Sequence, residues 1–368
     1  MFAFFFHSIL LNLCLRYGHQ TFPRSFSRCE LTILSQGICA VVVHSVMCFF
    51  STLVDSPHQS LCSSHLPTRI IQLLYFGSIV ILAQPLLLCK YISNLNLNVY
   101  SAIVSGACFT YASLWQMMRS EPIIWLLNFL FHSEKSVHLM RIWSICILVC
   151  VVFAALFTKL SGVKANTILR KFYHLVIVLV FITGAKYDLN LLYFASNSAL
   201  IILLLLEMVR LTRLPPLGNL IEKAFKQFRD EKDSGPLTLT HLYLLIGFSL
   251  PIWIVPELHN HTLIASGLIT IGFGDTFASL IGYTFGKHRW PDSKKTYEGT
   301  IGALVAQIIG GMVFLTYVGL AWNLLLVLKL ILISTTVSLV EAWTRQIDNL
   351  ILPLYFHLIW LLLDLLST

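Results

Sequence analysis

The feature that most restricts the fold of this chain is a series of long apolar segments separated by short polar ones. A helix needs about 20 consecutive apolar residues to cross the hydrocarbon core of a bilayer. Only 11% of the 368 residues are charged, which is about half the fraction that is usual in soluble domains. We therefore expect an all-α fold, a polytopic integral membrane helical bundle with about ten to twelve transmembrane helices.

The candidate membrane spans follow one another along the chain at short intervals. They are Leu31–Val54, Ile70–Leu88, Val99–Met118, Ile123–Phe131, Arg141–Ala155, Phe172–Gly184, Leu191–Val209, His241–Val255, Thr262–Gly286, Thr300–Leu320, Leu324–Val340 and Leu350–Leu366. Ile123–Phe131 and Phe172–Gly184 are too short to cross a bilayer alone, so we expect some helices to be partial. The first stretch, MFAFFFHSILLNLCLRYG, has no basic region before it and no clear cleavage site after it, which favours a short first helix over a cleaved signal peptide.

Basic residues concentrate in the connections on one side of the expected spans. After Thr158 the chain has 17 lysines and arginines, of which 15 fall in four regions on the same side and one, Lys186, falls in the opposite connections. The positive-inside rule places the basic side in the cytoplasm. Because membrane spans separate the basic regions, they form no continuous face for nucleic acid, and we expect phosphates and membrane lipids as partners.

The composition of the chain changes near residue 150. Residues 1–150 are predicted to form N-terminal transmembrane helices, whereas residues 151–368 contain nearly all of the patterned polar clusters. All nine cysteines lie at or before Cys150, none forms a CxxC pair, and most fall in apolar segments. We expect buried, reduced thiols rather than a zinc site or a disulfide framework.

One polar connection, Thr212–Thr240, is long enough to contain a helix of its own. Its apolar residues from Leu217 to Phe228 recur at three- and four-residue spacing, with basic residues between them. This pattern predicts an amphipathic helix. Two placements stay open: the helix lies in the cytoplasmic membrane interface, or it packs on the bundle as an ordinary connection.

A carboxylate lies near the middle of one expected span. Asp275, within the stretch GFGDTFASL, is the one charged residue of the 25-residue segment Thr262–Gly286. An acid inside a membrane costs several kcal/mol unless it is paired or hydrated, which favours a functional role. The alternative is a structural pair with a basic residue such as Arg170 or Lys329. The glycines before Asp275 predict an interrupted helix near Gly272–Gly274, which is tolerated at this depth where a helix lines a cavity.

Small residues recur at every fourth position of the same segment. They are Gly274, Ala278, Gly282 and Gly286. Such a stripe allows a neighbouring helix to approach closely, and Asp275 and Ser279 lie on the adjacent face, one turn apart.

The stretch that follows, GKHRWPDSKKTYEGT, combines basic residues, oxygen ligands and a predicted helix start. Four basic residues fall between Lys287 and Lys295, and Thr296, Glu298 and Thr300 supply oxygen atoms. A helix N terminus binds phosphate oxygens, lysines add positive charge, and carboxylates suit Mg²⁺ that arrives with a polyphosphate. A plain positive-inside loop would explain the lysines alone, and not the carboxylates beside them. The related stretch GYTFGKH is one residue short of a Walker A motif and lacks its Ser or Thr.

Further polar residues are expected to support the site from the same cytoplasmic side. They are Arg170, Lys171, His174, Glu207, Arg210, Asp230, Glu231, Asp233, Ser234, Gly235, Glu341, Asp348 and Asn349. Each has a simpler alternative: His174 as a buried core histidine, Glu207 and Arg210 as a local salt bridge, and the stretch RDEKDSGP as a solvated turn.

Several motifs in the second part of the chain resemble those of the dolichol kinase family, and more distantly those of phytol kinases and CDP-diacylglycerol synthases. They are GDTFASLIGYTFGKHRWPDSKKTYEGT, LRKFYH, LEMVR, DEKDSGPLTLTHLYLLIGFSLPIW and STTVSLVEAWTRQIDNLILPL. The resemblance implies a multi-pass enzyme of the endoplasmic reticulum membrane, with its active site facing the cytoplasm. Such an enzyme transfers the γ-phosphate of CTP to the hydroxyl of dolichol, and its product, dolichyl phosphate, serves protein glycosylation.

The resemblance also implies the residues of the site. The CTP-binding stretch of the family falls on loop 287–300, with Lys287, Arg289, Trp290, Pro291, Ser293, Lys294, Lys295, Thr296, Glu298, Gly299 and Thr300 as candidate CTP-binding residues. The catalytic candidates are Asp275, Lys294, Lys295 and Glu298. The lysines and the amides near Gly299 are assigned to the phosphates. Asp275 and Glu298 are assigned to Mg²⁺ or another divalent cation, or one of them to the proton of the alcohol, and the residues alone do not separate these roles.

The sequence differs from the family pattern in two respects. Asp292 stands where a small neutral residue is expected, so an additional acid beside the phosphate loop would weaken nucleotide binding slightly. The chain is also expected to be shorter at its N terminus than eukaryotic members, which affects how a lipid tail is accommodated.

Two other functions stay open at this point. A related enzyme that makes a CDP-lipid, or a phytol kinase, would share the Asp, Lys-Lys and Glu-Gly pattern. A transporter would use Asp275 as an ion site on a broken helix, but that class usually shows a second broken helix, and the first 150 residues contain no counterpart of GFGD.

Overall fold

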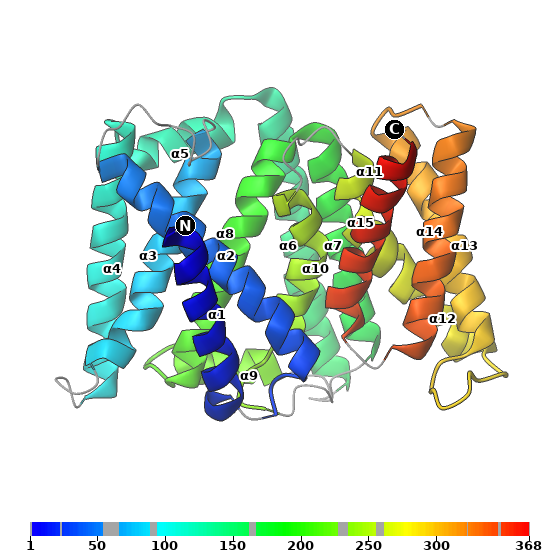
Figure 1. Ribbon diagram of the computed structural model, residues 1–368, viewed down its shortest axis with the longest axis horizontal. Coiled ribbons are helices and arrows are strands. Elements are labelled where there is room, and N and C mark those ends of the chain that lie inside the picture. The colour runs from blue at the N-terminus through cyan, green and yellow to red at the C-terminus, as the bar shows by residue number, and fades with distance from the viewer. Residues whose placement is uncertain are drawn as a thin grey trace. The chain divides into compact units, whose positions relative to one another are not determined.

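The computed structural model describes residues 2–22, 24–53, 66–88, 94–161, 167–226, 235–254, 261–321, 323–344 and 347–367. These residues form an all-α protein (Figure 1). The helices are α1 Phe2–Thr21, α2 Arg28–Leu53, α3 Leu66–Leu88, α4 Leu95–Met118, α5 Pro122–Phe131, α6 Glu134–Ser161, α7 Thr167–Tyr187, α8 Leu189–Leu211, α9 Gly218–Lys226, α10 Thr240–Ile254, α11 His261–Ile264, the π-helix η2 Leu268–Asp275, α12 Thr276–Phe285, α13 Tyr297–Tyr317, α14 Leu324–Trp343 and α15 Asp348–Ser367.

Nine helical segments in the described part of the chain are long and apolar enough to cross a membrane. They lie in α2, α3, α4, α6, α8, η2 with α12, α13, α14 and α15. The prediction of a polytopic helical membrane protein is therefore confirmed. Helix α5, with 10 residues, is as short as its sequence indicated, and the part of α7 whose side chains are described, Phe172–Tyr187, is apolar.

The helices form two compact units, and the chain passes from one to the other between α5 and α6, inside α8 and at the start of α10. Unit 1 comprises residues 1–133 and 194–240, and unit 2 comprises residues 134–193 and 241–368. Neither unit is one continuous piece of the chain. The sequence predicts a division near residue 150, with the catalytic residues in the second part. That division stays a prediction.

Unit 1 packs through glycines and a few buried polar groups. A Cβ atom on Gly106 of α4 would lie 2.2 Å from Ile81 of α3, so α3 and α4 approach too closely for a larger residue there. The hydroxyl of Tyr75 donates to Asn197 Oδ1 at 2.9 Å and connects α3 to α8. The Asn98 amide donates to the carbonyl of Pro85 at 2.9 Å, in the last turn of α3, where helical carbonyls have no intrahelical donor.

A buried arginine at the end of α8 connects three segments of unit 1. Arg210, at the end of α8, donates twice to Glu207, once to Glu222 of α9 and once to the carbonyl of Pro236, all at 2.6 or 2.7 Å. Glu207 also accepts the backbone N–H of Thr238 at 2.8 Å. Helix α9, the central part of the predicted amphipathic helix, is therefore fixed to α8 through its acidic face, while its Leu220 is 65% exposed.

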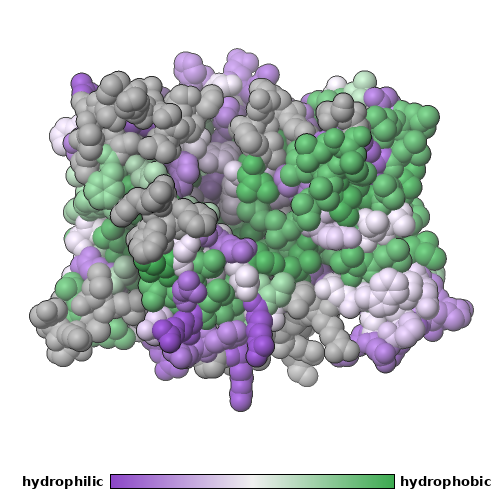
Figure 2. Space-filling view, in the orientation of Figure 1, coloured by the Kyte–Doolittle hydropathy of each residue, from purple (hydrophilic) through white to green (hydrophobic). Residues whose placement is uncertain are grey.

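Unit 2 contains α6, α7, α10, α11, η2 and α12–α15. Figure 1 shows that the connection from α12 to α13 and the corner from α14 to α15 lie at the same end of this unit. In Figure 2, hydrophobic side chains dominate over α13–α15, and hydrophilic ones gather toward the α12–α13 connection. Lys329 of α14 forms an ion pair with Asp364 of α15 at 2.8 Å, a partner other than the suggested Asp275.

The cysteines depart in part from expectation. Cys39 is a buried free thiol, whereas Cys29 and Cys108 are free but exposed. Cys48, by contrast, is disulfide-bonded. The expected reduced state therefore holds for some of the cysteines only, and spacing alone could not have revealed the exception.

Candidate active site

The segment before Asp275 is irregular, but it is not broken. Residues Leu268–Asp275 form π-helical turns that continue directly into α12. The predicted interruption near Gly272–Gly274 therefore takes the form of a wider helical turn. Such turns are rare and are frequent at functional sites.

The two glycines of GFGD lie where neighbouring helices leave no room for a side chain. A Cβ atom on Gly272 would lie 2.7 Å from Val178 of α7, and one on Gly274 would lie 2.6 Å from Gln307 of α13. Between them, the ring of Phe273 packs on Gly310 of α13, where a Cβ atom would lie only 2.4 Å from the ring. The two glycines thus let α7 and α13 approach η2, and this packing fixes the backbone that carries Asp275.

The small-residue stripe has the function that the sequence indicated. A Cβ atom on Gly299 of α13 would lie 2.8 Å from the carbonyl oxygen of Ala278 and 3.3 Å from Gly282 of α12. Gly286, the last residue of the stripe, faces Thr296, the residue that caps α13. The start of α13 is therefore held against the end of α12, next to the segment that begins at Asp275.

The connection between α12 and α13, residues 286–296, forms a closed loop. Arg289 pairs with Thr296 in an isolated antiparallel bridge, and the N–H of Trp290 donates to the carbonyl of Lys295 at 3.0 Å. At the tip, the N–H of Ser293 donates to the carbonyl of Trp290, which closes a turn with Pro291 and Asp292 in the middle. Asp292 has φ of 56°, a conformation that aspartate tolerates better than most residues. This turn explains the unexpected acid, which does not line the pocket described below.

The loop is fastened to the corner between α14 and α15. Lys295 Nζ donates to the carbonyl of Glu341 at 2.6 Å and to Asp348 Oδ2 at 3.2 Å. Its Nζ also lies 3.8 Å from Glu341 Oε1. Ser293 Oγ donates to the carbonyl of Ala342 at 3.1 Å. These contacts bring together residues that are about 50 positions apart in the sequence.

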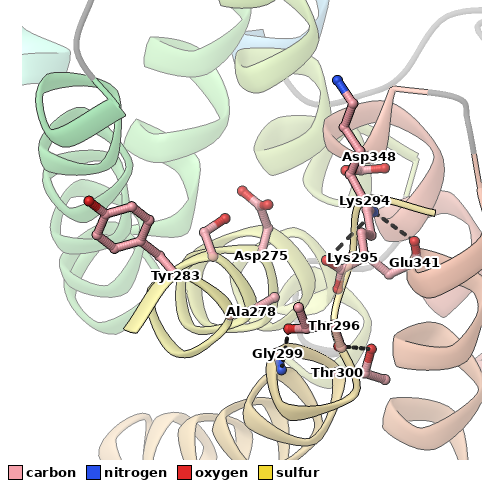
Figure 3. Close-up of a pocket in the computed structure, with 12 residues that line it drawn as sticks. Asp275, Ala278, Tyr283, Lys294, Lys295, Thr296, Gly299, Thr300, Glu341 and Asp348 are labelled. Atoms are coloured by element: carbon pink, nitrogen blue, oxygen red, sulfur yellow. Dashed lines mark hydrogen bonds and ion pairs between the residues drawn. The ribbon is translucent and has the colours of Figure 1, made fainter. Parts of the chain in front are cut away.

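A pocket of about 330 Å³ lies between η2–α12, the loop and the α14–α15 corner (Figure 3). It is lined by Asp275, Ala278, Ser279, Gly282, Tyr283, Lys294, Lys295, Thr296, Gly299, Thr300, Glu341 and Asp348. The structure thus joins the membrane carboxylate, both loop lysines and two of the predicted supporting acids in one cavity.

Asp275 and His174 form the buried end of this arrangement. Asp275 Oδ2 lies 3.6 Å from His174 Nδ1 of α7, and the side chains are 16% and 8% exposed. This distance is too long for a hydrogen bond, but it is short enough for the charge of the carboxylate to act on the imidazole ring. The predicted supporting residue His174 is therefore next to the acid, whereas the side chain of Arg170, the suggested structural partner, lies outside the described residues.

Glu298 is placed differently from the other catalytic candidates. Its carboxylate accepts the backbone N–H of His288 and lies 2.7 Å from the His288 ring, and Glu298 does not line the pocket. This pair connects the first residues of the loop to the first turn of α13 and so holds the two ends of the loop together. The role of Glu298 as a metal ligand or base stays a prediction, and the geometry gives it a structural task.

The remaining loop residues form the outer surface. Trp290 packs on Tyr297, with ring centroids 4.0 Å apart, and its indole N–H donates to Thr300 Oγ1 at 2.9 Å. Lys287, Arg289 and Pro291 are exposed and do not line the pocket. The amide of Gly299, assigned from the sequence to phosphate, donates instead to Oγ1 of the N-cap residue Thr296 at 3.1 Å.

Apart from His174, the predicted supporting residues divide into three groups. Glu341 and Asp348 line the pocket, and Asn349 is packed against Gly247 through its backbone carbonyl. Glu207, Arg210 and Gly235 belong to unit 1 and form part of its closed end. Asp230, Glu231, Asp233 and Ser234, with the side chains of Arg170 and Lys171, lie outside the described residues.

Sequence reasoning placed Ser279 one turn from Asp275 without assigning it to the site, and it missed Tyr283. Ser279 and Tyr283 follow Asp275 at four-residue spacing, and in a helix residues at this spacing lie on one face. That spacing was the available signal. For Tyr283 the signal was hidden because a tyrosine in an apolar helix has no chemical signature of its own.

The oxygen atoms of the pocket suit a hard divalent cation only if a bound substrate supplies further oxygen ligands. Carboxylate oxygens of Asp275, Glu341 and Asp348 line the cavity. Among the described residues, however, no three His, Cys, Asp or Glu side chains are close enough to hold a metal ion by themselves. This arrangement suits Mg²⁺, which is commonly held by one or two carboxylates and completed by substrate phosphates and water.

Comparison with known proteins agrees with the motifs. A family model described as dolichol kinase matches residues 4–291. The chain belongs to the dolichol kinase family. Dolichol kinase from Homo sapiens is 34% identical over 369 residues, which cover 94% of this chain and 66% of that protein. Dolichol kinase from Mus musculus is 41% identical over 257 residues, which cover 65% of this chain and 48% of that protein.

More distant relatives complete the comparison. A phytol kinase from Synechocystis is 33% identical over 94 residues, which cover 24% of this chain and 40% of that protein. No solved structure matches the chain. The chain spans about half to two thirds of the length of the dolichol kinases described above. The predicted resemblance to dolichol kinases, and more distantly to phytol kinases, is confirmed.

Proposed function

We propose that this member of the dolichol kinase family transfers the γ-phosphate of CTP to the terminal hydroxyl of dolichol, which gives dolichyl phosphate for protein glycosylation. Family membership supports the class of reaction. The observation that carries the proposal is the pocket, in which a carboxylate from a membrane segment and two lysines from a polar loop line one cavity. A water-soluble nucleotide and a membrane alcohol can meet only at such a boundary.

The charges of the pocket favour a triphosphate that arrives with a cation. The lining has three carboxylates and two lysines, a formal balance of −1 with histidine neutral. This balance would repel a free polyphosphate. A divalent cation, Mg²⁺ or a similar ion, would reverse the sign of the site and supply charge neutralisation at the transferring phosphate. Asp275 and Asp348 are the residues that we assign to it.

The residues of this chain mainly position the reactants. Lys294 is exposed at the edge of the pocket and has no ion-pair partner among the described residues, so it is available to the phosphates. Lys295 is already held by Glu341 and Asp348, and it fixes the loop while its charge faces the cavity. In phosphoryl transfer such positioning and charge neutralisation account for most of the catalysis.

The transfer step exchanges one P–O bond for another. The hydroxyl oxygen of the alcohol bonds to the γ-phosphorus, the bond from that phosphorus to the β-γ bridging oxygen breaks, and CDP leaves. The hydroxyl proton needs an acceptor. Asp275 suits both this task and that of metal ligand, because it is the buried acid at the membrane end of the pocket.

We also propose that the pocket faces the cytoplasm from the endoplasmic reticulum membrane. The excess of basic residues on one side of the spans supports this orientation. The α12–α13 loop, which carries four of those residues, is at the open end of the pocket.

The test uses the full chain, purified in lipid nanodiscs with dolichol, and CTP labelled at the γ-phosphate. Kinase activity places the label in the lipid fraction and releases CDP. A CDP-lipid enzyme would instead place the label in pyrophosphate. If the lipid does not become labelled, the proposed function is wrong, whether or not label appears in pyrophosphate. Parallel reactions with phytol decide between the dolichol and phytol kinase activities, because the phytol kinase match makes that second alcohol a specific alternative.

A further inference from the structure

Tyr283 combines two properties that rarely occur together. It lines the pocket, yet the residue is 92% exposed. It belongs to the segment Leu268–Phe285, one of those that are long and apolar enough to cross a membrane. Its side chain is therefore at once part of the cavity wall and part of the outer surface of unit 2.

A row of side chains leads from Tyr283 to Asp275. Asp275, Ser279 and Tyr283 succeed one another at four-residue spacing, and all three line the pocket. Figure 3 shows Asp275 between Tyr283 on one side and Lys294, Lys295, Glu341 and Asp348 on the other. The pocket thus has two chemically different sides, and the carboxylate lies between them.

The outer surface around Tyr283 is apolar. Leu280, three positions before Tyr283 on α12 and therefore on the same side of the helix, is 55% exposed. In a membrane segment, exposed apolar side chains face acyl chains. The Tyr283 side of the pocket is therefore continuous with a lipid-facing surface, whereas the lysine side belongs to a polar loop.

We propose that the Tyr283 side of the pocket receives the lipid alcohol directly from the bilayer. The hydroxyl of the alcohol passes Ser279 toward Asp275, and the first units of its apolar chain pack on the Tyr283 ring and on Leu280. This inference rests on the proposed function and assigns to Tyr283 the selection of a long-chain lipid alcohol, while nucleotide recognition belongs to the opposite side. Tyrosine suits this position, because its ring is apolar and its hydroxyl tolerates the hydrated membrane interface.

Kinetics with two substrates tests the inference. Tyr283→Ala is expected to raise the KM for dolichol, expressed as a mole fraction in mixed micelles, about tenfold, because it removes an apolar contact made by the chain. The KM for CTP is expected to stay within about twofold of the original, since the phosphate side is unchanged. Tyr283→Phe keeps the ring and is expected to behave like the original chain.

Phe285→Ala provides the matched control. Phe285 is an exposed aromatic residue of the same helix, two positions away, and it does not line the pocket. It should leave both KM values unchanged. The inference is overturned if Tyr283→Ala raises both KM values equally, if it changes neither, or if Phe285→Ala has the same effect on dolichol.

A crosslinking experiment separates the inference from the proposed function, because it needs no phosphoryl transfer. A long-chain prenol with a diazirine close to its hydroxyl, incorporated into phosphatidylcholine vesicles with the full chain, should label the peptide that contains Tyr283, and excess dolichol should compete. Labelling there without any CTP turnover would overturn the kinase proposal and leave the docking side in place. Turnover with specific labelling elsewhere, or with no specific labelling of that peptide, would overturn the docking side alone.

Discussion

The two units each contain a cluster of opposite charges, and the clusters differ in one decisive way. In unit 1, Arg210 is 5% exposed and uses Nε, Nη1 and Nη2 in bonds to Glu207, Glu222 and Pro236. In unit 2, Lys295 is held by Glu341 and Asp348, but these residues line a cavity together with Asp275 and Lys294. The first cluster is closed, and the second is open.

Whether a charged cluster borders a cavity distinguishes structural ion pairs from catalytic groups better than the charge or the burial of the residues alone. Both clusters come from motifs that resemble the family, and both contain acids and bases within a few residues of a helix end. The closed cluster has four of its five guanidinium N–H donors engaged, which leaves it little capacity for a ligand. The open cluster borders space in which oxygen atoms of a substrate could complete the coordination. A ligand would therefore bind to the second cluster without breaking the first.

The largest effect is expected at the open cluster. Asp275→Asn keeps the size of the side chain but removes the charge that the cation or the proton needs, so activity should fall about a thousandfold or more. The unfolding temperature of the purified protein should change little, because the residue borders a cavity and is not part of a closed network. Phosphate transfer per mole of folded protein is the measurement. Retention of more than a tenth of the activity would contradict the assignment of Asp275.

The closed cluster should give the opposite result. Arg210→Met leaves Glu207 as a buried charge without its partner, which costs about 3 to 5 kcal/mol when a buried ion pair is broken. Thermal unfolding should therefore occur at a clearly lower temperature, and activity should fall only in proportion to the loss of folded protein.

A double variant shows whether the unpaired charge is the cause. Glu207→Gln together with Arg210→Met removes both charges and keeps an oxygen that can accept the Thr238 N–H. This variant should recover a large part of the lost stability. If the single and the double variant are equally unstable, the ion pair is not what holds this end of unit 1.

The helices could be predicted from the sequence because a single physical requirement determines them. An apolar segment in a bilayer must satisfy its backbone hydrogen bonds internally, so length and hydropathy were enough to locate α2, α13 and α15. The shape of η2 was harder to predict. Gly272 and Gly274 indicated a break, because glycine disfavours a helix, but packing against Val178 and Gln307 explains their presence equally well. One sequence cannot separate backbone freedom from close packing.

The pocket could be predicted only where chemistry marked the residues. Asp275, Lys294 and Lys295 stood out through their charge, and their meeting in one cavity agrees with the expectation. Tyr283 did not stand out, because its proposed role depends on its position between the pocket and the outer surface, which the residue type does not indicate. Glu298 also stood out through its charge: a carboxylate in the first turn of a helix suits a metal, but it equally suits a nearby histidine.

The smallest effect is expected at a third pair of opposite charges, which belongs to neither cluster. The side chains of Glu298 and His288 are 26% and 77% exposed, and exposed pairs contribute little because water competes for both groups. Glu298→Gln keeps an oxygen that can accept the backbone N–H of His288, so phosphate transfer should change by less than about threefold. His288→Gln should have the same small effect, since both variants weaken the same brace. A thousandfold loss at Glu298→Gln alone, with His288→Gln unaffected, would restore Glu298 to the catalytic set and would show that the loop moves this acid into the pocket when the nucleotide binds.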